Sequence, residues 1–449
     1  MFECILLLAG TLSCLRATPA PLAPPGAMVA VERNVVYGMY SGLALLMDVY
    51  SPSTANGRGI LLIGGSGWHS HRGYRAGQKK AGALVEQSAI ALTDAGFTVF
   101  AINHREAPRF HWPAARDDAQ RAVRWIRHHA DRYGIAPQAI GVMGGSSGAH
   151  LAALLGTIEG NGDPDSPDPV ERESPRVQGV ALFAPATDLE AFGYEPRVVA
   201  MMGHTVVAGD GHDAYVEASP IRHVSPDDPP FFILHGQNDQ VVPVEQSVSM
   251  AEALREAGVD VALTILPEGD HNNWGGPEAT IRWLAEKLVG PEWAEGLASL
   301  EEARRLLEAA ESSALAGDVR SAVKGYERAQ ETDSRLTVQA ESWNTLCRSG
   351  AVHDRAAMVV EACDRAVSLQ PENGWYRDSR GLVRVLVGDI DGAIADFEAL
   401  VAWESFGIQG RPRVGDAMRE LRLEWIHTLR SGRNPFTPAT LARLRDGGG

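Results

Sequence analysis

Cysteine is scarce in this chain, and its apolar runs are short. Four cysteines among 449 residues are too few for a scaffold held together by disulfides. Cys4 and Cys14 stand near the start, and we expect the other two, Cys347 and Cys363, to be buried free thiols. The apolar run over residues 5–12 is too short to cross a bilayer, so we expect no transmembrane segment.

An excess of positive charge is also missing, since 41 Lys and Arg residues stand against 57 Asp and Glu residues. The net charge of −16 argues against a nucleic-acid partner, because phosphate binding requires a basic face. Two histidine pairs, His69 with His71 and His128 with His129, have no carboxylate or cysteine at metal-binding spacing. We therefore expect neither a metal nor an organic cofactor.

The N-terminus has the apolar core and the following small residues of a signal peptide, although Glu3 stands where a positive charge is usual. Four prolines between residues 19 and 26 indicate a flexible spacer. We predict a signal peptide over residues 1–20, a proline-rich spacer over residues 21–30, and export to the periplasm or the cell exterior. The alternative is a cytoplasmic protein whose start codon is assigned too early.

Short β-branched runs alternate with amphipathic segments between residues 31 and 290. We predict strands at residues 43–50, 59–63, 98–103, 139–143, 177–183, 230–235 and 261–266, and helices at residues 114–133, 149–157, 244–257 and 277–288. This alternation predicts an α/β domain with a mainly parallel sheet flanked by helices on both faces. An antiparallel hairpin is expected at its edge, around residues 35–50.

Beyond residue 291 the strand pattern stops and helical segments recur. Two segments share one spacing: Gly317-Asp318 precedes Ala322 and Tyr326, and Gly388-Asp389 precedes Ala393 and Phe397. Small and aromatic residues at such places let antiparallel helix pairs stack on one another. The spacing resembles tetratricopeptide repeats. That resemblance implies an all-α repeat domain over residues 300–410, a capping helix and tail over residues 411–449, and a groove for a peptide or protein partner.

One motif points to nucleophilic chemistry. Residues 144–148 read Gly-Gly-Ser-Ser-Gly, between an apolar run that predicts a buried strand and a segment that predicts a helix. Glycines at these places allow the tight turn that lifts the hydroxyl of Ser146 above the edge of a sheet. A serine in this position becomes a nucleophile only if a base and an acid can reach it.

Candidates for both follow later in the chain. Asp239 and His271 each stand on a loop just beyond a predicted strand, and the order Ser146, Asp239, His271 is that of a hydrolase whose three residues lie at strand ends. His271 would take the serine proton and return it to the leaving group, while Asp239 would fix the tautomer of the imidazole. This chemistry needs no cofactor.

Other carboxylates and histidines are less well placed. Asp228 precedes a predicted strand and Asp260 opens one, so neither is expected at the carboxyl end of the sheet. His235 lies inside a strand and is expected to be a core residue. His150 is expected to support the nucleophile turn.

The oxyanion that develops during an acyl transfer also needs hydrogen-bond donors to stabilise it. A glycine-rich turn over residues 64–68 follows a predicted strand, and we expect the backbone N–H groups of Gly65, Ser66 and Ser147 to form an oxyanion hole.

Three tryptophans have two open interpretations. Trp68, Trp112 and Trp274 would either line a substrate cleft or pack in the core.

Together these stretches resemble α/β-hydrolases of the esterase and lipase type, close to the bacterial feruloyl- and acetylxylan-esterase-like group. The matching stretches are residues 46–52, 103–108, 112–118, 141–150, 218–221 and 229–231. The sequence departs from the family where HGGGW is replaced by residues 64–68, and where His104 stands in place of a tyrosine.

The resemblance implies a serine esterase that acts through an acyl-enzyme on a small-molecule or carbohydrate ester, such as an acetyl or feruloyl ester. Two other hypotheses remain open. One is an amide-cleaving relative, a peptidase or arylformamidase with the same three residues. The other is a repeat scaffold with a vestigial hydrolase domain.

Overall fold

The computed structural model describes residues 29–69, 78–192, 195–203, 210–272, 277–405 and 416–445. The predicted signal peptide, nearly all of the predicted spacer and Trp274 lie outside these ranges. Among the described residues, no helix is long and apolar enough to cross a membrane.

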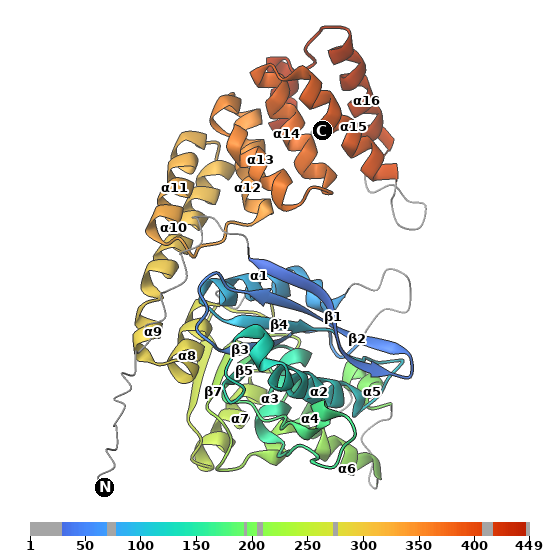
Figure 1. Cartoon of the computed structure of the whole chain (residues 1–449), viewed down its shortest axis with the longest axis vertical. Helices are drawn as coiled ribbons and strands as arrows, with labels where there is room; N and C mark the ends of the chain where they lie inside the picture. Colours follow the sequence, from blue (N-terminus) through green and yellow to red (C-terminus); the bar gives the residue numbers. More distant parts are fainter. Residues whose placement is uncertain are drawn as a thin grey trace, which may run out of the picture.

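Eight strands form one sheet in the order β1-β2-β4-β3-β5-β6-β7-β8 (Figure 1). Their bounds are β1 Ala30–Tyr40, β2 Leu43–Ser51, β3 Gly59–Ile63, β4 Thr98–Ile102, β5 Ile140–Gly145, β6 Val180–Phe183, β7 Phe231–Gly236 and β8 Val261–Leu266. β1 pairs with β2 and β2 with β4 in antiparallel register, and all other pairs are parallel. The predicted mainly parallel sheet with an edge hairpin is confirmed.

Helices cover both faces of the sheet, as predicted. α1 (Ala83–Asp94) and α8 (Glu278–Leu288) pack on one face, and α2 (Ala114–His128), α3 (Ser147–Thr157) and α7 (Glu245–Glu256) pack on the other. The central strands β3 and β4 are therefore buried along their whole length, which explains their unbroken apolar runs. The single helix predicted at residues 114–133 is interrupted at His129, where α2 gives way to a 3₁₀ turn, η2 (Ala130–Tyr133).

Shorter elements complete this α/β region. They are α4 (Leu189–Phe192), α5 (Pro196–Met202), α6 (Asp210–Glu217) and the 3₁₀ turns η1 (Lys79–Ala81), η3 (Pro169–Arg172) and η4 (Pro220–His223). α4 and α6 contact each other, and residues of α4, α5 and α6 pack with Trp68 in a small apolar cluster.

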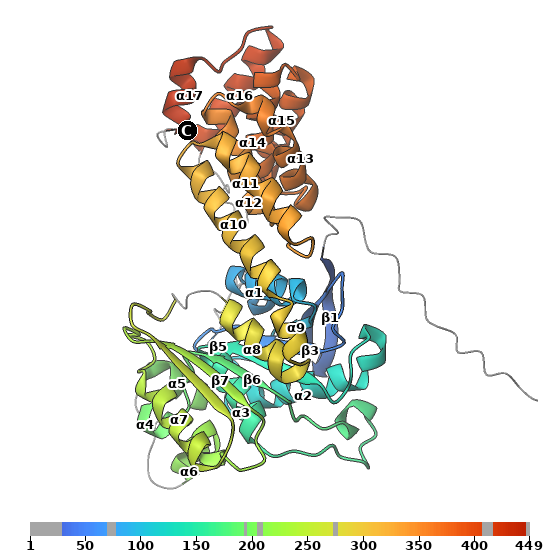
Figure 2. The same cartoon turned by 90° about the vertical axis from the view of Figure 1, so that its left-hand side faces the viewer.

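From Pro291 onward, every regular element of the described residues is a helix or a 3₁₀ turn. Its elements are α9 (Pro291–Glu295), α10 (Ala298–Leu315), α11 (Val319–Thr332), α12 (Ala340–Val352), the 3₁₀ turn η5 (Ala356–Met358), α13 (Val360–Leu369), α14 (Gly374–Val387), α15 (Ile390–Ser405), α16 (Asp416–Arg430) and α17 (Pro438–Arg445). Successive helices pack in pairs, α10 on α11, α12 on α13 and α14 on α15. Figures 1 and 2 show this helical region stacked against the α1 side of the α/β region.

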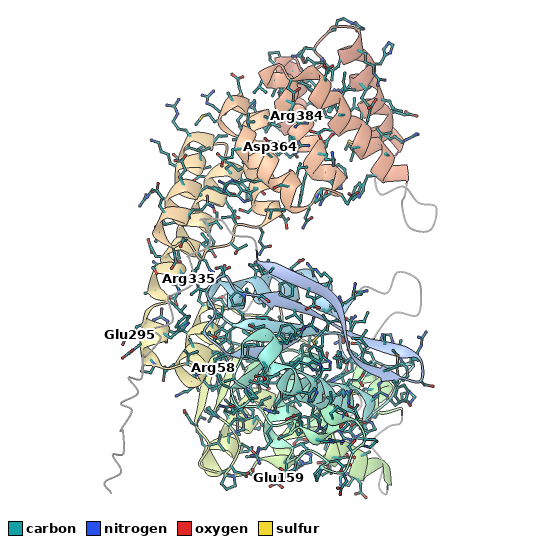
Figure 3. The ribbon with its side chains drawn as sticks, viewed as in Figure 1. Arg58, Glu159, Glu295, Arg335, Asp364 and Arg384 are labelled. Atoms are coloured by element: carbon teal, nitrogen blue, oxygen red, sulfur yellow. A yellow bond between two sulfur atoms is a disulfide. The ribbon has the colours of Figure 1, made fainter. Side chains whose placement is uncertain are left out.

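Small residues allow the helix pairs to approach closely. A Cβ atom at Gly381 would lie 2.7 Å from the ring of Phe397, so α14 and α15 can meet at this distance only with glycine there. Asp364 and Arg384, labelled in Figure 3, link α13 to α14 on the surface of the stack. The helical prediction is confirmed, whereas its assignment to tetratricopeptide repeats stays a prediction.

The prediction that Cys347 and Cys363 are free thiols is wrong. The two cysteines form a disulfide between α12 and α13. They are 16 positions apart in sequence, yet antiparallel packing of these helices brings their Cα atoms to 4.9 Å, within the range that a disulfide spans.

Candidate active site

Ser146 occupies a sharp turn between β5 and α3. Its backbone has φ 53° and ψ −123°, an unusual conformation for a residue with a side chain. The flanking glycines permit this turn: a Cβ atom at Gly144 would lie 2.3 Å from the carbonyl oxygen of Gly148, and one at Gly148 would lie 2.2 Å from that of Ile63. The Ser146 N–H donates to the carbonyl oxygen of Phe183 on the neighbouring strand β6, at 2.8 Å.

The structure brings Ser146, His271 and Asp239 together in one hydrogen-bonded chain. The Ser146 hydroxyl lies 3.0 Å from Nε2 of His271, and Nδ1 of His271 lies 2.7 Å from Oδ2 of Asp239. Because a carboxylate only accepts, Nδ1–H donates to Asp239 and leaves Nε2 free to accept from the serine hydroxyl. This arrangement can take a proton from Ser146.

The two loops that carry Asp239 and His271 lock against each other. The N–H of Asn238 donates to the carbonyl oxygen of Gly269 at 2.9 Å. A Cβ atom at Gly236, the last residue of β7, would lie 2.5 Å from the carbonyl carbon of Gly269. Glycine at the end of β7 therefore lets the loop that carries His271 reach the loop that carries Asp239.

Asp239 is held as a carboxylate. Burial by itself would raise the pKa of Asp239, but hydrogen bonds from the N–H of Val242, from His271 and from the N–H of Val241 lower it below its usual range. The two backbone N–H groups lie 2.9 Å and 2.8 Å from Oδ1, and His271 uses Oδ2. The negative charge beside His271 is thus maintained without solvent contact.

His235 is a second partner of Asp239 that the sequence interpretation treated only as a core residue. It is completely buried at the end of β7, and burial lowers its pKa. Its Nε2–H points at the carbonyl oxygen of Val242 (3.0 Å) and at Oδ2 of Asp239 (3.2 Å), while its Nδ1 accepts from the hydroxyl of Ser247 at 2.7 Å. Its position four residues before Asp239 on a strand end is the signal that could have identified it.

The rival residues lie in other environments. Both carboxylate oxygens of Asp228 accept from Ser225, and Asp260 forms an ion pair with Lys287 at 3.0 Å. His150 is fully buried, and burial lowers its pKa to about 4 against the opposing effect of its bond to the Ala218 carbonyl. His150 is therefore neutral.

The expected oxyanion donors surround the nucleophile, but one is already engaged. The N–H of Ser66 donates to the side-chain hydroxyl of Ser147 at 2.8 Å. Outside the helices and strands, no backbone hydrogen bond among the described residues uses the N–H of Gly65, and Ser147, as the first residue of α3, has no partner for its N–H within that helix. Gly65 packs directly on the turn, since a Cβ atom there would lie 3.0 Å from Cβ of Ser146.

A buried polar group anchors the glycine-rich turn, and sequence reasoning did not find it. The hydroxyl of Ser66 donates to Glu106, a buried carboxylate that lies 3.9 Å from Nε2 of His104. Ser66 and His104 are two of the three positions at which the sequence departs from the resembled family, the third being Gly64 in place of a histidine. These two departures therefore meet at Glu106.

The two described tryptophans differ in exposure. Trp68 is only 4% exposed, and its indole N–H donates to Nδ1 of His150 at 3.0 Å. Trp68 thus packs in the core, the second of the two roles left open by the sequence. Trp112 is partly exposed, with the guanidinium of Arg116 5.0 Å from its ring centroid. In the described parts of the chain, no group of three metal-ligating side chains is arranged to hold an ion.

Comparisons with known proteins find relatives for the α/β region. A protein-family model described as BD-FAE matches residues 47–254. The "Probable carboxylic ester hydrolase LipM" of Mycobacterium tuberculosis is 31% identical over 57% of this chain and 59% of its own length. "Esterase LipQ" of the same organism is 36% identical over 40% of this chain and 44% of its own length. The chain thus spans less than two thirds of the length of these relatives.

One solved structure, described as a truncated form of a carbohydrate esterase from gut microbiota, is similar with a TM-score of 0.50 and 26% identity. The similarity covers 59% of this chain and 98% of that one. The α/β region therefore has the α/β-hydrolase fold, and its relatives are named as esterases.

Proposed function

We propose that this protein is a serine hydrolase that cleaves carboxylic esters through an acyl-enzyme. The observation that carries the proposal is the continuous hydrogen-bonded chain from Ser146 through His271 to Asp239, with distances of 3.0 Å and 2.7 Å. Similarity to proteins named as esterases supports the choice of an ester as substrate.

In the proposed reaction, Nε2 of His271 takes the hydroxyl proton of Ser146 as the serine oxygen bonds to the ester carbonyl carbon. The imidazolium formed in this step is stabilised by the Asp239 carboxylate. The same proton then passes to the departing alcohol as its bond to the carbonyl carbon breaks. In a second round, His271 takes a proton from water as the water oxygen bonds to the acyl carbon. The bond from that carbon to the serine oxygen then breaks, His271 returns the proton to Ser146, and the acid is released.

The negative oxygen of each tetrahedral intermediate would accept from the N–H groups of Gly65 and Ser147. The N–H of Ser66 can join them only after it leaves the hydroxyl of Ser147, to which it donates at 2.8 Å. Exchanging one such hydrogen bond for another costs little, about 1 kcal/mol, so Ser66 stays a candidate third donor.

For the substrate we propose small acetyl or feruloyl esters on carbohydrate. The description of the similar solved structure as a carbohydrate esterase supports this class. An amide-cleaving relative is the competing outcome. Rates with p-nitrophenyl acetate, acetylated xylo-oligosaccharides, a prolyl anilide and N-formylkynurenine separate the two, and the proposal requires the esters to be turned over faster.

A fluorophosphonate probe tests the mechanism directly. Wild-type protein should be labelled at one serine and lose its activity, and the Ser146→Ala variant should be neither labelled nor active. A folded wild-type sample that takes up no label would favour the scaffold hypothesis. Circular dichroism on both samples ensures that the comparison is between folded proteins.

We also propose that the protein works in an oxidising compartment after export. The buried disulfide between Cys347 and Cys363 supports this, because such bonds persist in secreted and periplasmic proteins and are rare in the cytosol. Mass spectrometry of the native protein tests both points: the proposal expects a processed N-terminus and an oxidised cysteine pair.

A further inference from the structure

A small polar cluster lies beside the glycine-rich turn that carries the expected oxyanion donors. The N–H of Ser66 donates to the hydroxyl of Ser147 at 2.8 Å, and the hydroxyl of Ser66 donates to the carboxylate of Glu106. The two serine hydroxyl oxygens lie 3.4 Å apart. Ser66 thus holds Ser147 with its backbone and Glu106 with its side chain.

The cluster reaches from the exposed turn into the protein interior. Gly65 is exposed and Ser66 is partly buried, whereas the side chain of Glu106 is only 4% exposed. A carboxylate buried to this degree destabilises the folded state unless hydrogen bonds replace its hydration. Glu106 therefore needs a donor at this place.

Ser66 is that donor. Among the residues that the structure describes, it provides the only hydrogen bond to the side chain of Glu106. Nε2 of His104 lies 3.9 Å from the same carboxylate oxygen, which is too far for a hydrogen bond. The Glu106 side chain is therefore held by Ser66, and it holds Ser66 in return.

The backbone around Glu106 is fixed by other bonds. The N–H of Ala107 donates to the carbonyl oxygen of Trp68 at 2.9 Å. The N–H of Arg105 donates to the buried carboxylate of Asp118 at 2.7 Å. The Glu106 side chain thus extends from a segment whose position does not depend on it, and its removal would free the glycine-rich turn without unfolding that segment.

Both expected oxyanion donors belong to residues that this cluster holds. One donor is the N–H of Gly65, which precedes Ser66 in the chain, and the other is the N–H of Ser147, whose hydroxyl accepts from Ser66. An oxyanion hole is effective because its donors are already in position when negative charge develops. A displacement of about 1 Å in a catalytic site can cost about 100-fold in rate.

We infer that Glu106 is a positioning residue of the oxyanion hole and acts through the hydroxyl of Ser66. The inference rests on the proposed function and adds a residue to its machinery. Glu106 contributes through geometry alone: it accepts from Ser66 throughout the reaction and exchanges no proton with the substrate.

The test measures initial rates of p-nitrophenyl acetate hydrolysis by variants of the full chain. Glu106→Met removes the acceptor at nearly constant length and should lower kcat at least about tenfold with little change in KM. Glu106→Gln keeps an oxygen that can accept from Ser66 and should recover most of this rate. Ser66→Ala should be slowed as Glu106→Met is, and the double variant should be no slower than Ser66→Ala, because both changes remove one and the same bond.

Thr337→Val is the matched control. It also removes a hydroxyl that donates to a buried carboxylate, that of Asp94 at 2.7 Å. Asp94 lies just before β4 begins, at the opposite end of the sheet from the nucleophile turn, so kcat should not change. Circular dichroism checks the fold of each variant. If Glu106→Met does not fold, the comparison of Ser66→Ala with Thr337→Val decides the question.

Four results would overturn the inference: a wild-type kcat in folded Glu106→Met, a Glu106→Gln variant as slow as Glu106→Met, losses that multiply in the double variant, or an equal loss in Thr337→Val. Failure of the proposed function would be recognised separately. Wild-type protein would then hydrolyse no ester and take up no fluorophosphonate label, and the inference would fall with it.

Discussion

Replacing Gly65 by alanine should remove most of the activity and leave the fold in place. A Cβ atom at this position would lie 2.8 Å from the carbonyl oxygen of Gly145 and 3.0 Å from Cβ of Ser146. Non-bonded carbon atoms prefer a separation of about 3.5 Å. The nucleophile turn would therefore have to move away from Gly65 by roughly half an ångström. One of these two atoms is a backbone oxygen at the end of β5, and the other belongs to the strained nucleophile turn. Neither is the end of a flexible side chain that could move at little energetic cost.

A retreat of this size moves the Gly65 N–H away from the oxyanion. Loss of one preorganised donor costs about 10²-fold to 10³-fold in kcat, and partial displacement should fall at the lower end, about 100-fold or ~2.7 kcal/mol in the activation free energy. KM should change little, because the interaction is made mainly in the transition state.

The assay is the initial rate of p-nitrophenyl acetate hydrolysis over a range of concentrations, with thermal melting to monitor the fold. Gly82→Ala is the control, since the nearest atom to its added Cβ would be 3.4 Å away, an ordinary contact. If well-folded Gly65→Ala protein keeps kcat within about threefold of wild type, Gly65 is not an oxyanion donor and that part of the mechanism is wrong.

Substitutions at three other buried groups give further tests. His235→Phe removes a donor to Asp239 and should lower kcat about tenfold with little change in KM, whereas His235→Gln, which keeps a donor, should recover most of the rate; equal kcat values for the two variants would deny His235 a positioning role. Burial raises the pKa of Asp94 to about 6 from its ordinary value of 3.8. The folded state therefore binds more protons than the unfolded state between these values, and stability should fall as the pH rises through them. The loss is on the order of 3 kcal/mol, and Asp94→Asn should flatten this dependence in thermal unfolding; an equally steep curve would contradict it. Replacing Cys347 and Cys363 by alanine opens a 16-residue loop and should cost about 3 kcal/mol in denaturant unfolding, a difference that should vanish under reducing conditions.

Much of the fold could be predicted because its signals are local. The strands at residues 59–63 and 261–266 begin and end where the apolar runs predicted. Boundaries moved where a contact with a distant part of the chain intervened. The strand predicted from residue 177 starts only at Val180, and the Gln178 side chain accepts from the N–H of Ile140 just before that point.

The candidate site could be predicted from the sequence for a similar reason. Ser146 and His271 are 125 residues apart, and His271 and Asp239 are 32 apart, yet each follows a recognisable strand. Because the carboxyl ends of parallel strands share one edge of a sheet, the position of each residue along its strand was enough to predict that they meet.

The sequence by itself determined the alternation of strands and helices, the nucleophile turn and its acid and base candidates, since each depends on residues close together in the chain. Only the tertiary structure decided that Cys347 bonds to Cys363, that the Ser66 N–H is taken by Ser147, and that Arg304 of α10 contacts the end of α1 at Ala91. These features depend on the distance between surfaces of separately folded elements. That distance is set by how side chains interlock across the whole core, which no local pattern records.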